Sequence, residues 1–346
     1  MTQSNKAAWT IEVQANPLQV KESAYPSAGA NELVVKSHAI AINPIDVGLQ
    51  DHGQHMFQWL KYPFIFGSDL AGEVVEVGSE VSGFKTGDRV LALAVASDPD
   101  CNNPAHGAFQ NYSLVRADLA TKIPSSLAYD HAAVLPLGLA TAASGLFPKD
   151  FLGLQLPTVP AQPSTGQVLI VWGGSTSVGS NAIQLAVAAG YEVFTTASPR
   201  NFDYVKRLGA SQAFDYKDEN VVQKLIDALK NKTVAGAFAI GEGSTECCSK
   251  ILSKANGAKF IADVNPRSPP IPKELGVSSK FVWGSDLKKS EVGPAIFSNY
   301  LTKALETGNY ISAPEPEVIG QGLENVQKGI DTVRNGVSAK KIVVTL

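Results

Sequence analysis

The chain has 346 residues, of which 44% are hydrophobic and 18% charged, a length and composition that exclude a disordered or fibrous protein and predict one large domain or two domains. The formal net charge at pH 7 is −3, so no basic excess favours nucleic acid or an anionic membrane as the partner. We therefore expect the main partner to be a small molecule.

No segment has the features of a membrane span or a secretory signal. The longest uncharged stretch of note, residues 132–147, is shorter than the ~20 apolar residues of a spanning helix and contains Pro136. The first six residues lack the apolar core of a signal peptide. The three cysteines, Cys101 and the adjacent pair Cys247 and Cys248, form neither a disulfide framework nor a CxxC motif. We expect a cytoplasmic protein.

The first 125 or so residues are predicted to be rich in β-strands and to contain no long helix. Short β-branched runs at 32–37, 72–77 and 89–95 are separated by turn-forming segments. A small apolar helical segment follows at about residue 130, and a proline-rich connector covers residues 148–166.

From Gln167 onward the pattern alternates between strand and helix. Strands are predicted at 168–172, 192–196, 213–215, 235–240 and 259–262, with helices at 177–189, 201–208, 219–229 and 243–252. This alternation predicts a parallel, doubly wound sheet. The last 40 or so residues have the same pattern as the N-terminal part and end in a strand at 341–345. The expected fold is α/β, with a discontinuous β domain (residues 1–127 and 309–346) into which a doubly wound domain (residues 128–308) is inserted.

A glycine-containing loop directly follows the first strand of the inserted domain. Its residues are Gly173, Gly174, Ser175, Thr176, Ser177, Val178 and Gly179. Glycines allow a tight turn and close approach to a pyrophosphate, which the amides at a helix N-terminus stabilise. The spacing G-x-x-T-x-x-G is a weak motif alone, but its place after a buried strand favours dinucleotide binding. A plain strand-to-helix turn is the alternative.

The end of the second strand of this domain indicates which dinucleotide is bound. Folds that prefer NAD place a carboxylate here, whereas NADP requires room and positive charge. The run after Thr196 has no carboxylate, and it offers Ser198 to hydrogen-bond a 2′-phosphate and Arg200 to pair with it. We predict NADP(H) as cofactor; the alternative is that Ser198 caps a helix and Arg200 is solvated.

Motifs spread along nearly the whole chain carry a resemblance to a known family. They lie at 41–46, 66–78, 87–90, 107–109 and in the glycine-containing loop. Together they resemble the zinc-free, quinone-reductase-like branch of the medium-chain dehydrogenases/reductases. The runs 173–176, 198–202 and 214–216 are most similar to fungal trans-acting enoyl reductases, which work with polyketide synthases. The resemblance implies a GroES-like domain and a Rossmann domain with NADPH bound in the cleft.

The zinc enzymes of this family differ from the chain at their metal-binding motifs. They present a Cys near position 43 and Gly-His-Glu where this chain has Gly67, Ser68 and Asp69, and their four-cysteine lobe is reduced here to Cys101. The remaining donors, in residues 51–55, lie in one short polar segment, and we interpret its histidines as solvated or pocket-lining. We expect no metal site.

The resemblance also implies which residues contact the cofactor. Residues 175–178 would hold the pyrophosphate, Val264 and Asn265 would lie beside the nicotinamide, and a second group, Ser198, Arg200, Asn201 and Tyr216, would hold the adenosine phosphate. Tyr216 could instead close a hydrophobic edge. Lys340 and Lys341 either approach the cofactor phosphates or are solvated ends of the last strand.

The implied reaction is hydride transfer from the nicotinamide to the β-carbon of an activated alkene, near Asn43, Asp46 and Thr141. Asn43 could instead be a turn residue, and the Thr141 hydroxyl could bond its own helix backbone. Many relatives carry a Lys where this chain has Gly48, and some use a Tyr donor that is absent here. His52 or His55 could supply the proton, and so could solvent.

The leading prediction is an NADPH-dependent, zinc-independent reductase of a C=C bond in an enoyl thioester or an enone, within fungal polyketide biosynthesis. The alternatives are an NADPH quinone oxidoreductase and a cofactor-binding fold-mate with a non-reductive role.

A polyketide synthase carrier domain is a candidate partner. The strand near residues 281–283 joins dimers in quinone-reductase-like relatives, whereas trans-acting enoyl reductases can be monomers, so both states stay open. Residues 265–285 are expected to line a pocket entrance or an interface.

Overall fold

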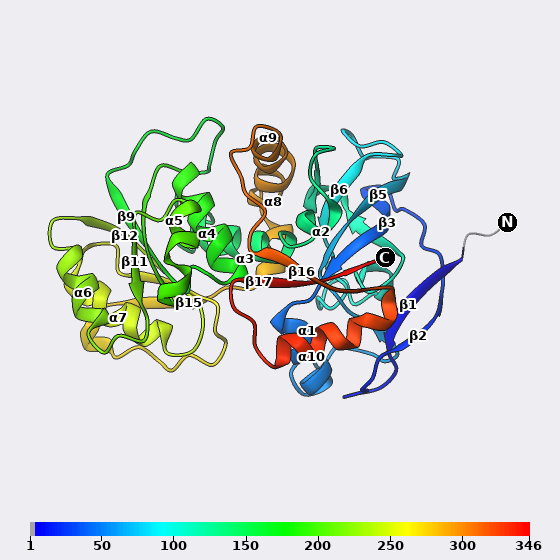
Figure 1. The fold of residues 1–346 in the computed structure, drawn as a ribbon, viewed down its shortest axis with the longest axis horizontal. Helices are drawn as coiled ribbons and strands as arrows, with labels where there is room; N and C mark the ends of the chain where they lie inside the picture. The colour runs from blue at the N-terminus through cyan, green and yellow to red at the C-terminus, as the bar shows by residue number, and fades with distance from the viewer. Residues whose placement is uncertain (1–3) are drawn as a thin grey trace. The chain divides into compact units, whose positions relative to one another are not determined.

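The structure is a computed structural model and describes residues 4–346 (Figure 1). The chain divides into two compact units, of which unit 1 comprises Met1–Leu137 and Ser312–Leu346 and unit 2 comprises Gly138–Ile311. The predicted domain boundaries lie near residues 127 and 308, about ten and three residues before these. Within residues 4–346, no helix has the length and apolar character needed to cross a membrane.

Unit 1 contains a seven-stranded sheet of order β16-β17-β3-β5-β6-β8, in which β7 also pairs with β3, and a three-stranded sheet of order β2-β1-β4. Its strands are β1 (Asn5–Thr10), β2 (Gln19–Ser23), β3 (Glu32–Ala41), β4 (Phe64–Ile65), β5 (Asp69–Val77), β6 (Arg89–Leu93), β7 (Tyr112–Arg116), β8 (Ala120–Lys122), β16 (Glu315–Gln321) and β17 (Lys340–Thr345). Antiparallel pairing sets Val343 of β17 opposite Ala41 of β3. One sheet therefore joins segments from the beginning and the end of the sequence.

The helices of unit 1 are α1 (Pro44–His52), α2 (Tyr129–Ala132) and α10 (Val326–Arg334), and α3 (Pro136–Leu146) begins in it. Helix α1 was not anticipated. Its apolar periodicity is weak, and the signal that could have found it is an N-terminal capping box, in which the side chains of Asn43 and Asp46 bond each other's backbone N–H groups. α1 is fastened to α10, since the Gln50 amide donates to Gln327 at 2.8 Å and Arg334 pairs with Asp51 at 2.8 Å.

Unit 2 is the predicted doubly wound α/β domain. Its parallel strands have the order β11-β10-β9-β12-β14-β15, and β13 pairs with β12. The strands are β9 (Gln167–Trp172), β10 (Glu192–Ala197), β11 (Gln212–Asp215), β12 (Thr233–Ala239), β13 (Asn256–Gly257), β14 (Phe260–Asp263) and β15 (Ser278–Phe281). The helices are α4 (Ser177–Ala188), α5 (Phe202–Arg207), α6 (Val221–Ala228), α7 (Ser244–Lys254), α8 (Val292–Pro294) and α9 (Thr302–Glu306).

The core of unit 2 explains why its strands could be predicted. Ile170 of β9 and Ala237 of β12 are fully buried and pack with Leu225 of α6 and Ile251 of α7. Strands covered by helices in this way are apolar throughout, which makes them conspicuous in a sequence. The helical region from α8 to α9, with a π-helical stretch at Ala295–Leu301, was not predicted, because Gly293 and Pro294 interrupt its pattern.

Candidate functional site

The loop between β9 and α4 has the geometry of a phosphate cradle. Gly173 has φ +88°, a conformation that favours glycine. A Cβ at Gly174 would lie 2.1 Å from Thr195 Oγ1, and a Cβ at Gly179 would lie 2.2 Å from the carbonyl oxygen of Gly173. Side chains at these two positions would thus push the strand, the loop and the helix apart. The glycines allow the backbone to turn tightly at the N-terminus of α4.

The outer residues of this loop remain accessible to a ligand. Thr176 is the N-cap of α4, and its hydroxyl accepts from Gly179 N–H at 3.0 Å and donates to the Gly173 carbonyl at 2.8 Å. Ser175, Ser177 and Val178 are half-buried and Thr176 is exposed. The N–H groups of the first helical turn, together with the helix dipole, favour an anion here. The arrangement fits the pyrophosphate predicted for these residues.

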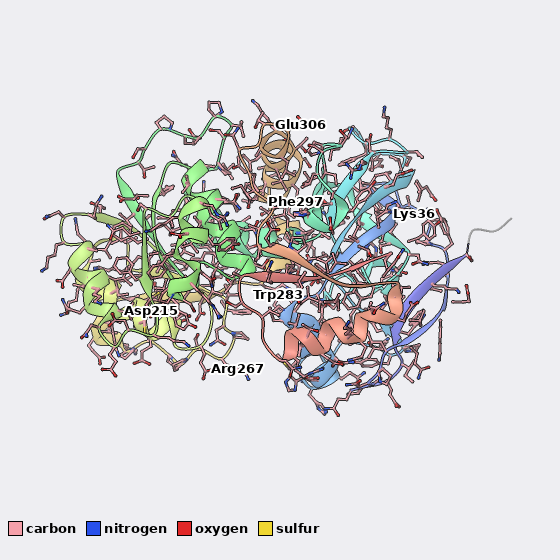
Figure 2. All side chains as sticks on the ribbon, in the orientation of Figure 1. Lys36, Asp215, Arg267, Trp283, Phe297 and Glu306 are labelled. Carbon is pink, nitrogen blue, oxygen red and sulfur yellow. The ribbon has the colours of Figure 1, made fainter. Side chains whose placement is uncertain are left out.

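The carboxyl ends of β10 and β11 bring two predicted adenosine-binding residues together. Ala197 and Asp215 are register partners in parallel strands, so Ser198 and Tyr216, which follow them, are neighbours at the same edge. Tyr216 is 44% exposed, and Figure 2 labels Asp215, the residue that precedes it in the chain. The Asp215 carboxylate accepts the Lys217 backbone N–H at 3.0 Å, so it acts as a turn acceptor.

Arg200 and Asn201 follow Ser198 in the short 3₁₀ helix η4 (Pro199–Asn201) but differ in exposure. Arg200 is exposed, and within residues 4–346 its guanidinium forms no ion pair. Asn201 is 9% exposed, and its backbone N–H donates to the Ser198 carbonyl at 2.8 Å. A free guanidinium next to a half-buried serine suits a phosphate monoester.

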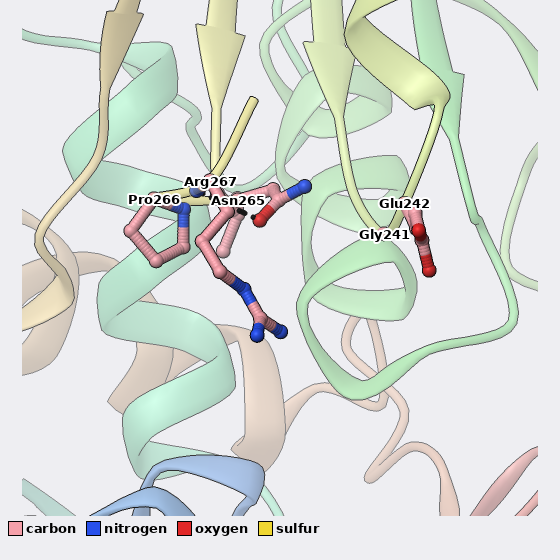
Figure 3. Close-up of a pocket in the computed structure, with 6 residues that line it drawn as sticks. Gly241, Glu242, Asn265, Pro266 and Arg267 are labelled. Atoms are coloured by element: carbon pink, nitrogen blue, oxygen red, sulfur yellow. Dashed lines mark hydrogen bonds between the residues drawn. The ribbon is translucent and has the colours of Figure 1, made fainter. Parts of the chain in front are cut away.

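A pocket of about 520 Å³ lies at the carboxyl ends of β12 and β14. Its lining residues are Gly241, Glu242, Val264, Asn265, Pro266 and Arg267, and Figure 3 shows them. Val264 and Asn265 were predicted to lie beside the nicotinamide, and both line this pocket. Arg267 was not singled out, although it belongs to the segment 265–285 that was expected to line a pocket entrance or an interface. Its side chain extends from the loop after β14, and the Glu242 carboxylate does not point toward it (Figure 3).

A buried polar cluster in unit 1 surrounds Asn43. The Asn43 Nδ2 donates to Asp69 Oδ2 at 2.8 Å, and the Lys341 ammonium donates to Asn43 Oδ1. Lys341 also pairs with Asp69 Oδ2 at 2.8 Å, while the Leu137 N–H donates to Asp69 Oδ1 at 2.6 Å. Asn43, Asp69 and Lys341 are all buried. The Asn43 carboxamide is therefore fixed at both ends by charged partners.

Asp46 joins the cluster through the backbone and titrates abnormally. Its Oδ2 accepts the Asn43 N–H at 2.8 Å, whereas its buried Oδ1 has no partner among the described residues. Burial, which is the largest cause, and the nearby Asp69 raise the pKa of Asp46 to about 7, against the lowering effects of the Asn43 N–H and Lys341. At neutral pH a substantial fraction of Asp46 is thus protonated.

Lys341 corrects one expectation from the sequence. The two lysines of the last strand were expected either to approach the cofactor phosphates or to be solvated, and Lys340 is indeed exposed. Lys341 is 4% exposed and is ion-paired with Asp69, so it is not a solvated strand end. The sequence feature that could have predicted this pairing is Asp69, which opens the apolar run of β5. A carboxylate that is buried there requires a cationic partner.

Thr141 lies on α3 in unit 2, under the backbone of Gly284. Thr141 is 6% exposed, and a Cβ at Gly284 would lie 2.3 Å from its Oγ1. One turn further along, the Ser144 hydroxyl donates to the Gly284 carbonyl at 3.1 Å. The predicted catalytic residues are therefore divided between the units, with Asn43, Asp46 and His52 in unit 1 and Thr141 in unit 2.

The two histidines after Asp46 lie at the other end of α1. His52 is the last residue of the helix, His55 follows in a short 3₁₀ turn, and both are exposed.

At Gly48, the position where many relatives carry a Lys, an added Cβ would meet nothing within 4 Å. In the part of the chain that the structure describes, no group of three or more His, Cys, Asp or Glu residues is placed to hold a metal ion.

Comparisons with known proteins give a consistent family assignment. Residues 29–125 match the alcohol dehydrogenase GroES-like domain. The chain is 49% identical to dehydrogenase pigH of Monascus ruber, covering 99% of this chain and 100% of that protein. It is 39% identical to trans-enoyl reductase himH of Aspergillus japonicus, over 99% of this chain and 97% of the relative. An alcohol dehydrogenase superfamily structure from Novosphingobium aromaticivorans superposes with a TM-score of 0.80 at 23% identity, with 99% of each chain covered.

Proposed function

The chain belongs to the medium-chain dehydrogenase/reductase family of oxidoreductases, and from this premise we propose that it is an NADPH-dependent reductase of an activated C=C bond in an enoyl thioester or an enone. The name of the relative from Aspergillus japonicus supports the enoyl substrate. When bound, the cofactor supplies a hydride for the β-carbon of the alkene, and a proton completes the α-carbon.

The observation that carries the proposal is the arrangement at the ends of β9, β10 and β11. The glycine cradle before α4 receives the pyrophosphate. Ser198 and Arg200 receive the 2′-phosphate, and the exposed Tyr216 ring, the neighbour of Ser198 across the two strands, covers the adenosine. A planar guanidinium matches a phosphate with two parallel hydrogen bonds, which favours NADPH over NADH.

The polar cluster in unit 1 supports a zinc-independent reaction. Asn43 and Asp69, which stand where the family's zinc enzymes carry a Cys and a Glu, are bound to each other and to Lys341. The ammonium already balances the buried carboxylate, so these side chains need no further cation. In this proposal the cluster fixes the N-terminus of α1, while His52, His55 or solvent provides the proton.

Arg200→Gln tests the cofactor assignment directly. We expect the Kd for NADPH to rise roughly 10- to 100-fold, because a charge-assisted pair with the 2′-phosphate is lost, while the Kd for NADH stays unchanged. Calorimetric titration of both cofactors measures this. Arg207→Gln is the matched control, since Arg207 is exposed at the end of α5 and is not placed at the site.

Oxidation of NADPH with enones, enoyl thioesters and quinones then tests the reaction. Turnover of an enone or enoyl thioester supports the proposal. Turnover of quinones alone would assign a quinone oxidoreductase instead, and NADPH binding with no turnover of any acceptor would indicate a non-reductive role.

A further inference from the structure

We propose that Arg267 binds the phosphate of a 4′-phosphopantetheinyl thioester, the arm shared by coenzyme A and carrier proteins. The inference rests on the proposed function, because it identifies the part by which an enoyl thioester would be held at the same site. It starts from the pocket at the ends of β12 and β14, where Arg267 is a lining residue (Figure 3).

The backbone that carries Arg267 is fixed by a chain of hydrogen bonds. The buried Asp263 accepts the Asn265 N–H at 2.9 Å through Oδ1 and the Thr245 hydroxyl at 2.8 Å through Oδ2. The Asn265 side chain in turn accepts the Arg267 N–H at 3.0 Å, and Thr245 also contacts the Ser268 hydroxyl at 3.0 Å. The loop after β14 is thus anchored on both sides of Arg267, so little backbone ordering remains to be done on binding.

The Arg267 guanidinium is available to a ligand. Within residues 4–346 it makes no ion pair and no side-chain hydrogen bond, although its backbone N–H donates to Asn265. Arg267 is exposed, and Glu242, the acidic residue of the pocket lining, belongs to the loop after β12 and does not point toward Arg267 (Figure 3). An unpaired guanidinium on a rigid loop matches the fork geometry of a phosphate.

The sheet order indicates that this phosphate belongs to the substrate. In the order β11-β10-β9-β12-β14, the proposed 2′-phosphate lies at β10 and β11 and the proposed pyrophosphate lies at β9. Neighbouring strands are ~4.8 Å apart, so β14 is roughly 10 Å from β9, with β12 between them. In the proposed function both phosphate positions of the cofactor therefore lie at other strands than β14.

The test compares a thioester that lacks the phosphate of the arm with three thioesters that carry it, of which the 4′-phosphopantetheine thioester differs from the pantetheine thioester by the phosphate alone. Wild type, Arg267→Gln and Arg267→Lys are assayed with NADPH and four 2-butenoyl thioesters. The thioesters are those of pantetheine, 4′-phosphopantetheine, coenzyme A and an acyl carrier protein. We expect Arg267→Gln to raise the KM of each phosphorylated thioester roughly 10- to 100-fold and to leave the pantetheine thioester and kcat unchanged. Arg267→Lys should raise the KM less than Arg267→Gln does, since lysine keeps the positive charge but lacks the paired N–H donors of the guanidinium.

Two further measurements separate the possible outcomes. Lys273→Gln, an exposed cation of the same segment outside the pocket, is the matched control and should have no effect. A lower affinity of Arg267→Gln for NADPH, or an equal loss with pantetheine, would overturn the proposal. If no thioester is turned over, the proposed function fails, but calorimetry with 4′-phosphopantetheine and pantetheine on the NADPH-loaded protein still tests Arg267 by itself. A preference for the coenzyme A arm or for the carrier arm identifies the source of the phosphate.

Discussion

At the residue scale, Asp46 makes the stability of the protein depend on pH in an unusual direction. Its pKa is about 7 in the folded chain and 3.8 in the reference state, so the folded state holds the proton more tightly. The contribution of this bound proton to the free energy of unfolding is fully present below about pH 3.8 and is lost as the pH rises to about 7. Lys341 and Asp69 are the charged groups that face Asp46 from β17 and β5.

Asp46→Asn should remove this dependence, since an amide has nearly the shape of a protonated carboxyl group. We expect the variant to be more stable than wild type by a few kcal/mol at about pH 8, and the difference to shrink at about pH 5. Urea denaturation at the two pH values measures it. A variant whose midpoint follows the same pH dependence as wild type would show that Asp46 is not the titrating group.

The buried pair of Asp69 and Lys341 should behave as one unit. Asp69→Asn leaves the Lys341 ammonium without its counter-charge, and we expect a loss of about 3–5 kcal/mol; Lys341→Met should cost a similar amount. The double variant should be more stable than the sum of the two losses implies, because neither charge is then left unpaired. Denaturant unfolding of wild type, the two single variants and the double variant gives the coupling energy between the two residues. If the two losses in the free energy of unfolding simply add, the pairing is refuted.

At the element scale, the turn from β9 into α4 was predictable, whereas the body of α1 beyond its capping box was not. The former combines a fully apolar strand, a glycine-containing loop and an apolar helix in one continuous segment. The latter has a mid-helix glycine and several polar residues, and it depends on contacts with α10 that are made only in the folded chain. Local patterns therefore found the first and missed the second.

Gly179→Ala tests the cradle as an element. The new Cβ would lie 2.2 Å from the Gly173 carbonyl oxygen, a backbone atom that can retreat only by distorting the loop. We expect a large loss of NADPH affinity and a lower melting temperature. Gly48→Ala is the matched control, because it also lies within a helix but its Cβ meets open space, and it should stabilise the protein by about 0.5–1 kcal/mol. Unchanged NADPH binding by Gly179→Ala would count against the cradle.

At the scale of the whole chain, the fold class followed from the sequence but the polar cluster did not. The alternation of strand and helix in residues 167–262 has one physical reading, a parallel sheet covered by helices. Asn43 and Lys341, by contrast, are 298 residues apart and meet only because β17 pairs with β3. No local pattern contains that contact. The segment that contains Arg267 was expected to line a pocket entrance or an interface, but the availability of its guanidinium was not predicted, since its isolation from acidic partners is a property of the folded loop.

Because β17 pairs with β3 across the whole of unit 2 in the sequence, the two parts of the polar cluster are synthesised at different times. During synthesis, Asn43, Asp46 and Asp69 leave the ribosome first, and residues 138–311, a continuous unit that can complete its own core, follow before Lys341 exists. Until β17 is added, the carboxylate of Asp69 has no ammonium partner, and residues 39–41 of β3 lack the strand with which they pair. The Asp69 carboxylate therefore lacks this counter-charge until β17 has been synthesised, and the cluster can be completed only after the whole of unit 2 has left the ribosome.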